Sequence, residues 1–245
     1  MALAHGTVTT NNQTAAEGPH GPASFSHDNG GAGCLLVIVC ANRDTAVATT
    51  FSCNYNSVAM TKVVEYQNVG AAETYTDGAA FILEGSWSGS LTINLVFDNT
   101  TTDVVDSWTI QAIPITGYKA GDLTGAVDAT PWTGTANKSA LTQGVTTTGD
   151  ASWIVMLYCP RDPTNHGPVT VSGGGTKITE SESAVEGNAG SLLCTAYLEV
   201  ASALTADDIT CTGSASDSMV GGSFELLAAV AGGATVVENI SIIGA

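Results

Sequence analysis

Apolar and polar residues alternate with a period of two along most of the chain. In SLTINLVFD, residues 90–98, every second residue from Leu91 to Phe97 is large and apolar, and the residues between them are mostly polar. FSCNY (51–55) and SWTIQAI (107–113) follow the same pattern. Strict alternation is the signature of a strand that buries one face. The pattern therefore predicts a protein built from half-buried β-strands.

Two runs, CLLVIVC (34–40) and WIVMLYC (153–159), are apolar on both faces. Neither spans a membrane, because a transmembrane helix needs roughly 20 apolar residues. If the first run is extended, Cys34 and Cys40 lie roughly 20 Å apart, beyond the separation of about 7 Å that a disulfide tolerates. Both runs therefore predict central strands that are covered on both sides.

Turn-forming segments separate the predicted strands. They are GGAG (30–33), DNTTTD (98–103), RDPTNHGP (161–168), GGG (173–175) and GSASDS (213–218). Helix signals are nearly absent, no repeat period is evident, and a single all-β domain commonly reaches this length. We therefore expect one jelly-roll-like sandwich of two antiparallel sheets over residues 23–233, with an N-terminal arm or edge segment at 1–22.

The last twelve residues, ATVVENISIIGA (234–245), follow a Gly-Gly break and have strand character. Their apolar positions are Val236, Val237, Ile240, Ile242 and Ile243. One interpretation is a further edge strand of the sandwich. The other is a docking tail that pairs with a neighbouring chain by strand addition, which makes a homo-oligomer.

The charge balance excludes some partners. Six basic and 23 acidic residues give a net charge of −17. Such a surface repels phosphate groups, so we expect neither nucleic acid nor an anionic membrane as a partner. The segment MALAHGTVTTNNQTAAEG lacks the basic and apolar regions of a secretory signal. We therefore expect synthesis in a cytoplasm, where thiols stay reduced.

The six cysteines form no CxxC pair, so zinc-ribbon and redox motifs are missing. Cys53 shares a predicted strand face with Phe51 and Tyr55, as expected for a small buried hydrophobe. We predict buried, reduced thiols, with disulfides or metal ligation as the alternatives. No metal or cofactor is expected, although Asp98, Asp103, Asp106, Asp207 and Asp208 lie in or near turns and leave calcium open as an alternative.

No motif points to an enzyme. HExxH is absent, GGGTK at 173–177 lacks the spacing of a phosphate loop, and Gly85-Ser86-Trp87-Ser88-Gly89 has tryptophan where a hydrolase elbow has its nucleophile. Trp87, Tyr118 and Trp132 are candidate glycan-binding residues, since a flat exposed ring complements a sugar ring. The alternative is that these rings fold back over the open end of the sandwich.

The order of several segments resembles a family of glycine- and threonine-rich, jelly-roll-like β-sandwich modules, found in bacteriophage structural proteins and bacterial surface proteins. The segments are CLLVIVC, FSCNYNSVAMTKV, AAFILEGSWSGSLTINLVF, IQAIPITGYKAGD and GDASWIVMLYC. The matching residues are Tyr55, Met60, Thr61, Val63, Leu83, Gly89, Ile93, Leu95 and Phe97. Asn56-Ser57 replaces the usual glycine region, and Gly85-Ser86 stands where proline is common. The match covers roughly residues 33–230.

These matched residues are core and turn residues, so the resemblance implies a fold more than a chemistry. Together with the acidic surface, it implies a non-enzymatic structural protein of a tailed-phage virion. We expect a capsid decoration or other component of the virion surface, with the major capsid protein or other virion proteins as partners. The alternative is a carbohydrate- or receptor-binding module of a phage tail or bacterial surface protein.

Overall fold

The structure, a computed structural model, describes most of the chain. The described residues are 2–14, 23–43, 49–67, 75–98, 105–128, 131, 138–161, 168–183, 190–203, 206–217 and 219–229. They form antiparallel strands and turns, and no helix occurs among them. This confirms the predicted all-β sandwich with little or no helix; the jelly-roll detail of that prediction is not confirmed.

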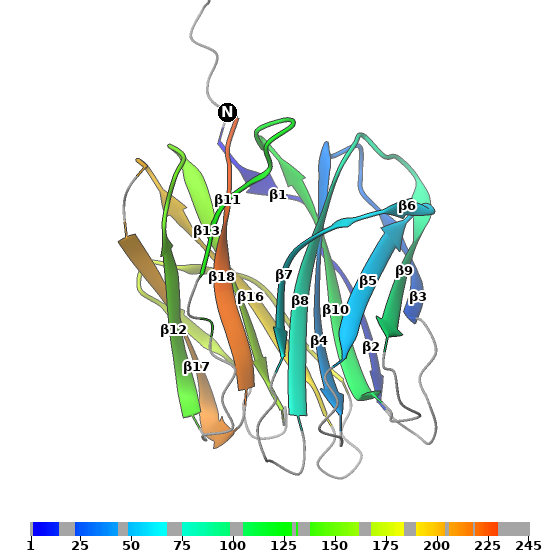
Figure 1. Ribbon diagram of the computed structural model, residues 1–245, viewed down its shortest axis with the longest axis vertical. Helices are drawn as coiled ribbons and strands as arrows, with labels where there is room; N and C mark the ends of the chain where they lie inside the picture. Colours follow the sequence, from blue (N-terminus) through cyan, green and yellow to red (C-terminus); the bar gives the residue numbers. More distant parts are fainter. Residues whose placement is uncertain are drawn as a thin grey trace, which may run out of the picture.

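Four sheets stack face to face as four layers (Figure 1). The first outer sheet holds, in spatial order, β3 (Ala23–Asp28), β9 (Ser90–Asp98), β5 (Thr50–Tyr55) and β6 (Val58–Ala59). The first inner sheet holds β1 (Ala4–His5) and β2 (Thr9–Thr14) along β10 (Val105–Thr116), then β4 (Cys34–Arg43), β8 (Tyr75–Glu84) and β7 (Thr61–Gln67).

The other two layers come from the second half of the chain. The second inner sheet holds β11 (Thr124–Val127), β18 (Met219–Leu226), β13 (Ser152–Pro160), β16 (Leu192–Val200) and β15 (Thr176–Glu182). The second outer sheet holds β12 (Lys138–Thr146), β17 (Ala206–Asp217) and β14 (Thr170–Ser172). The sequence led us to expect two sheets. There are four because both inner sheets bury both of their faces.

The two halves have the same topology. The strands of the second half occupy the same positions as those of the first, in the same order along the chain. Strand β11 corresponds to β1 and β2 together. The strands β12, β13, β14, β15, β16, β17 and β18 correspond to β3, β4, β5, β7, β8, β9 and β10, respectively. Only β6 lacks a counterpart among the described strands. The region 23–233, expected to be one sandwich without a repeat, thus lies across two sandwiches of equal strand order, which we call the first and the second sandwich.

Three hydrophobic cores fill the spaces between the four layers. Alternate residues of β4 separate two of them: Leu35 and Val37 face the core of the first sandwich, while Leu36 and Ile38 face a middle core. The middle core also holds residues of β13, such as Val155. The third core fills the second sandwich. Both apolar runs of the sequence are therefore central strands covered on both faces, as predicted.

Polar contacts also join the two inner sheets across the middle core. The buried Gln111 side chain donates to the carbonyl of Leu193 at 2.8 Å and to the hydroxyl of Ser181 at 2.9 Å. The hydroxyl of Thr195 donates to Gln111 Oε1 at 2.5 Å. On the other side of the interface, the Tyr66 hydroxyl contacts the Ser223 carbonyl at 3.5 Å. These bonds are directional and fix how one sandwich sits on the other.

The six cysteines are all buried and unbridged, as the sequence predicts. Burial raises the pKa of Cys53 to about 12. Burial and the charge of Glu84 do the same for Cys34. Thiols of such high pKa stay protonated at neutral pH and are poor nucleophiles.

The structure describes the turn in which Asn56-Ser57 stands in place of the glycine region of the modules that the sequence resembles. Asn56 and Ser57 have positive φ angles of 49° and 64° in the turn that joins β5 to β6. Glycine adopts this left-handed conformation most readily, and asparagine is the next most tolerant residue. The turn thus has the backbone that glycine would favour at these positions.

The two ends of the chain differ in what the structure describes. Within the N-terminal segment 1–22, residues 4–5 and 9–14 form β1 and β2, which pair with β10 at the edge of the first inner sheet. The candidate tail positions Val236, Val237, Ile240, Ile242 and Ile243 lie outside the described residues. Among the residues described, no helix is long and apolar enough to cross a membrane.

Candidate functional site

A hollow of about 520 Å³ opens at one end of the first sandwich. It lies between the segment joining β1 to β2, the turn after β3 and the end of β10. Its lining residues are Gly6, Thr7, Thr9, Asp28, Asn29, Gly30, Gly31, Ala32, Pro114 and Thr116. Its volume is within the range of small-molecule sites. The hollow is therefore large enough to hold a ligand.

A buried histidine lies behind this lining. The alternation of β3 turns His27 inward, and only 1% of the residue is exposed. Its Nδ1 lies 2.9 Å from the hydroxyl of Thr9, and its carbonyl accepts a hydrogen bond from Tyr55 at 3.1 Å. Burial lowers the pKa of His27, and Asn29 and the Asp28 charge offset this only in part. The ring is therefore neutral at pH 7.

Asn29 is the most deeply buried polar residue of the lining, with 1% of its surface exposed. Its amide nitrogen donates to the carbonyl of Ala32 at 2.7 Å. Its Oδ1 and the Nε2 of His27 are buried and make no hydrogen bond of ordinary geometry with a described residue, although the Asn29 side chain is close enough to His27 to raise its pKa. Buried polar atoms in folded proteins are nearly always well paired, so these two atoms, from residues two positions apart, call for an explanation.

Small residues keep the hollow open. Gly30 and Gly31 have φ angles of +61° and +75°, and a Cβ on either would meet nothing within 4 Å. The Asp28 carboxylate accepts a hydrogen bond from the Gly30 amide at 2.9 Å and so fixes this turn. On the opposite wall, a Cβ on Gly6 would lie 3.2 Å from the Pro114 ring. The walls are thus backbone and short side chains.

The pairing register locates the equivalent place in the second sandwich. His5 pairs with Ile115 in the first inner sheet, and Thr124 pairs with Leu226 in the second. The next residue of both edge segments is a glycine, and both segments leave regular pairing there. Pro114 precedes Ile115 just as residue 225 precedes Leu226, so these two positions correspond.

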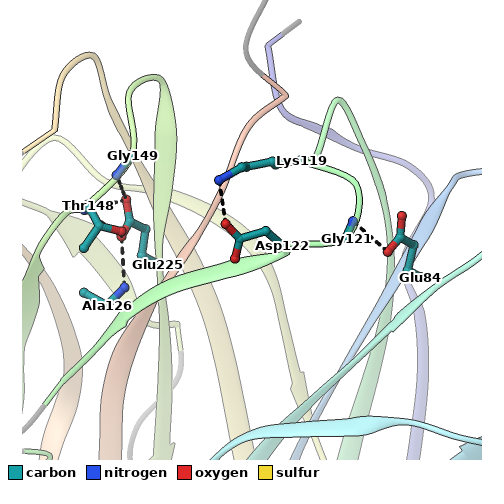
Figure 2. Close-up of polar contacts among 8 residues, drawn as sticks. All are labelled: Glu84, Lys119, Gly121, Asp122, Ala126, Thr148, Gly149 and Glu225. Atoms are coloured by element: carbon teal, nitrogen blue, oxygen red, sulfur yellow. Dashed lines mark hydrogen bonds and ion pairs between the residues drawn. The ribbon is translucent and has the colours of Figure 1, made fainter.

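Glu225 fills the equivalent place in the second sandwich (Figure 2). Its buried carboxylate accepts hydrogen bonds from the amides of Ala126 at 3.0 Å, Thr148 at 2.8 Å and Gly149 at 2.9 Å. The Thr148 hydroxyl adds a fourth bond at 2.8 Å. A Cβ on Gly125 would collide with Glu225 Oε2, which explains the glycine. The second sandwich therefore closes with its own side chain the place that is hollow in the first.

These bonds also set the charge state of Glu225. Burial alone would raise its pKa, but the hydrogen bonds from Ala126, Gly149 and Thr148 outweigh that effect, so the pKa of Glu225 is lowered. Hydrogen bonds from backbone amides favour the charged form of a carboxylate. Glu225 is therefore an anion held mainly by the backbone.

The connection between the two sandwiches passes beside this place (Figure 2). The amide of Gly121 donates to Glu84 Oε2 in the first sandwich at 3.0 Å, and the amide of Lys119 donates to the Leu227 carbonyl at 2.9 Å. Lys119 also pairs with Asp122 at 2.5 Å, an exposed pair of the kind that contributes little stability. The connection is thus bonded to both sandwiches.

The candidate glycan-binding residues are not gathered on one surface. Trp87 is half-buried, packs against the first core, and meets the Tyr55 ring edge-on at 5.8 Å. Tyr118 is half-buried against the middle core, and a Cβ on Gly33 would lie 2.5 Å from its hydroxyl. The two rings therefore pack on opposite faces of the first inner sheet. Trp132 lies outside the described residues, and glycan binding by this set stays a prediction.

The described acidic candidates for calcium belong to different sandwiches, Asp98 and Asp106 to the first, and Asp207 and Asp208 to the second. Asp207 and Asp208 line a smaller hollow of about 230 Å³ beside β12, whereas Asp103 lies outside the described residues. Within the described part of the chain, no three His, Cys, Asp or Glu side chains group so as to hold a metal ion.

The sequence did not single out His27, Asn29 or Glu225. A faint signal was present for Glu225, which is the only charged residue of the apolar run SFELLAAV (223–230). The chain matches no protein-family model, no curated protein and no solved structure, so the reading of this site rests on its geometry.

Proposed function

We propose that the protein is a non-enzymatic structural component of a tailed-phage virion, a capsid decoration or other particle-surface protein that acts by protein–protein adhesion. The observation that supports this most is the doubling of the fold. The two sandwiches share the middle core, and their outer sheets lie at opposite sides of the stack (Figure 1). One rigid body thus displays two outer sheets of equal topology in opposite directions.

Both outer sheets present polar, mostly uncharged residues to solvent. Those of the first include Ser24, Ser26, Thr50, Ser52, Asn54, Thr92 and Asn94, and those of the second include Thr142, Thr146, Thr170, Ser172, Thr210, Thr212 and Ser214. Hydroxyl and amide groups suit the hydrogen-bonded contacts of a protein interface. A body with two similar faces can bridge two neighbours in a symmetric lattice, because each neighbour offers the same surface.

The acidic charge and the resemblance support the same proposal. A net charge of −17 suits the outside of a particle better than the side that faces DNA. The partners would be the major capsid protein or other virion proteins. The C-terminal residues Val236, Val237, Ile240, Ile242 and Ile243 are candidates for pairing with a neighbouring copy, which would give a homo-oligomer on the virion surface.

Quantitative mass spectrometry of purified particles tests the proposal. The particles are those of the phage whose genome encodes the chain, and the reference is the major capsid protein. We expect the protein at a simple whole-number ratio to a capsid symmetry element, and we expect a reagent that cannot enter particles to label it. Its absence from particles, or labelling only after they are broken open, would reject the proposal.

The hollow of the first sandwich favours a second candidate function, a carbohydrate- or receptor-binding module of a phage tail or bacterial surface protein. The two functions differ in what the protein retains. A decoration protein should bind particles that lack it, and a glycan module should bind sugars when no particle is present.

A further inference from the structure

We propose that the hollow of the first sandwich binds a small, neutral, hydroxyl-rich molecule such as one ring of a saccharide. The second sandwich contains a closed copy of this site, in which Glu225 occupies the place of the ligand. The proposal deepens the second candidate function, which rests on the same hollow, and it does not depend on a virion role.

The lining decides the chemical class of the ligand. Among its ten residues there is no lysine or arginine, and Asp28 is the one acid. The carboxylate of Glu225 needs no basic side chain in the second sandwich, but an anionic ligand in the hollow would lie beside the Asp28 carboxylate, in a protein whose net charge is −17. An apolar ligand would find no large hydrophobic side chain to cover it, as such sites normally provide. Threonine hydroxyls, the Asn29 amide and backbone groups remain, and these match a neutral polyol.

The side chains of Asn29 and His27 point to the same class. Asn29 lines the hollow with an unpaired Oδ1, which can only accept a hydrogen bond. His27 backs the lining through its bond to Thr9, and its Nε2 makes no hydrogen bond of ordinary geometry, although the Asn29 side chain lies close enough to act on the ring. A sugar hydroxyl both donates and accepts, so it can pair with Asn29 Oδ1 while accepting from a neighbouring donor.

In the second sandwich, the backbone at the equivalent place donates hydrogen bonds to oxygen atoms. There the turn after β12 and the edge residue Ala126 direct amide hydrogens at the two oxygens of Glu225. The equivalent residue of the first sandwich, Pro114, has no polar side-chain atom. The first sandwich therefore lacks an internal occupant, and an external one can take its place.

A calcium ion is the other occupant that oxygen-rich walls suggest, but the geometry argues against it. Calcium takes six to eight oxygen ligands, usually including several carboxylates. Asp28 is the one carboxylate of the lining, and its Oδ1 is already bonded to the Gly30 amide. Calcium is therefore an alternative for the test to exclude.

Saturation-transfer NMR on the full-length protein tests the proposal. Glucose, galactose, mannose and N-acetylglucosamine are each added at about 50 mM, which would nearly saturate a site of millimolar affinity. Thr7 is an exposed residue of the rim, so Thr7→Trp should fill the hollow without disturbing the fold. The matched control is Thr170→Trp, which changes an exposed threonine of the remote second outer sheet.

We expect saturation transfer to at least one sugar with the wild type and the Thr170→Trp control, and a loss of about tenfold or more in affinity for Thr7→Trp. Pro114→Glu introduces the residue found at the equivalent position of the second sandwich, so it should also weaken sugar binding. This variant tests the proposal if Thr7→Trp fails to fold. Transfer to no sugar, equal transfer in all variants, or a response to calcium chloride alone would overturn the proposal.

Discussion

The two sandwiches have the same strand order, yet their equivalent ends differ, and the pair Pro114 and Glu225 shows this most clearly. In the first sandwich Pro114 leaves a hollow beside Asn29, whereas in the second Glu225 fills that place and bonds the turn around it. The backbones that frame the two places correspond in pairing register. The comparison teaches that one topology can leave this end of the fold open or close it with a side chain of its own.

The two sandwiches also stabilise a buried carboxylate in different ways. Asp77 of the first pairs with Arg43 at 2.6 Å, both side chains being at most 1% exposed, and the guanidinium lies 4.6 Å from the Tyr75 ring centroid. Glu225 of the second is held by amides and one hydroxyl. Removing one partner should therefore leave a buried charge in the first case and unpaired amides in the second.

The largest effect is expected from Asp77→Ala. The substitution removes the Asp77 carboxylate from the buried Arg43 charge, and breaking a buried ion pair typically costs about 3–5 kcal/mol of unfolding free energy. Guanidinium chloride unfolding measures the loss. The matched control is the double variant Arg43→Met, Asp77→Leu, which removes both charges and should recover most of the stability. A single variant as stable as the wild type would contradict the assignment of the ion pair.

Glu225→Gln should cost less, about 2–3 kcal/mol, because its amide group can accept at one atom only and leaves part-buried backbone amides unpaired. The same unfolding experiment applies. Pro114→Ala, at the equivalent position of the first sandwich, should change the unfolding free energy by about 0.5 kcal/mol, since no hydrogen bond of its side chain is lost. Equal losses of unfolding free energy for the two variants would contradict the inference that a side chain stabilises the closed end of the second sandwich and not the open end of the first.

The two sides of the middle core give a smaller contrast. Gln111→Leu removes three hydrogen bonds across the interface and should cost about 1–2 kcal/mol. Tyr66→Phe removes one long contact on the other side and should cost about 0.5 kcal/mol. Urea unfolding of both variants measures the difference. A larger loss of stability for Tyr66→Phe than for Gln111→Leu would contradict the inference that the hydrogen bonds of Gln111 orient the two sandwiches.

The smallest effect is a pH dependence. The lowered pKa of Glu225 means that its stabilising contribution is complete above the unfolded value of about 4.3 and is lost as the pH falls through the folded value. The difference in stability between wild type and Glu225→Gln should thus be constant from pH 7 to about pH 5 and shrink below about pH 4. Acid titration at fixed urea measures it. A difference that grows as the pH falls would mean that Glu225 is protonated in the native state.

Much of the fold could be predicted from local sequence. Alternation in 90–98 and the two fully apolar runs identified strands and even their central place, because burial on one or both faces acts on each strand separately. Buried thiols followed from the same alternation. The presence of two sandwiches of one topology could not be predicted in this way, because strand order depends on long-range pairing. The two halves of the chain share a burial pattern more than residue identity.

The candidate site was the least predictable part. Trp87 and Tyr118 were singled out because they are aromatic residues near turns, but sequence does not show which face of a sheet a turn residue packs against. His27 and Asn29 belong to an ordinary alternating strand and its turn, and their importance comes from β1, β2 and β10 lying beside them. A constant offset offers one signal: CLLVIVC and WIVMLYC both end in cysteine, at 40 and 159, and Gly6 and Gly125 have the same spacing.

The central claim is that two sandwiches of one topology share a core and act as one rigid body. Differential scanning calorimetry of the full chain tests it most directly, because a shared core couples the unfolding of both halves. We predict one transition whose calorimetric and van't Hoff enthalpies agree, moved as a whole to lower temperature by Asp77→Ala in the first sandwich and by Glu225→Gln in the second. Two separate transitions, each moved by only one of these variants, would contradict it.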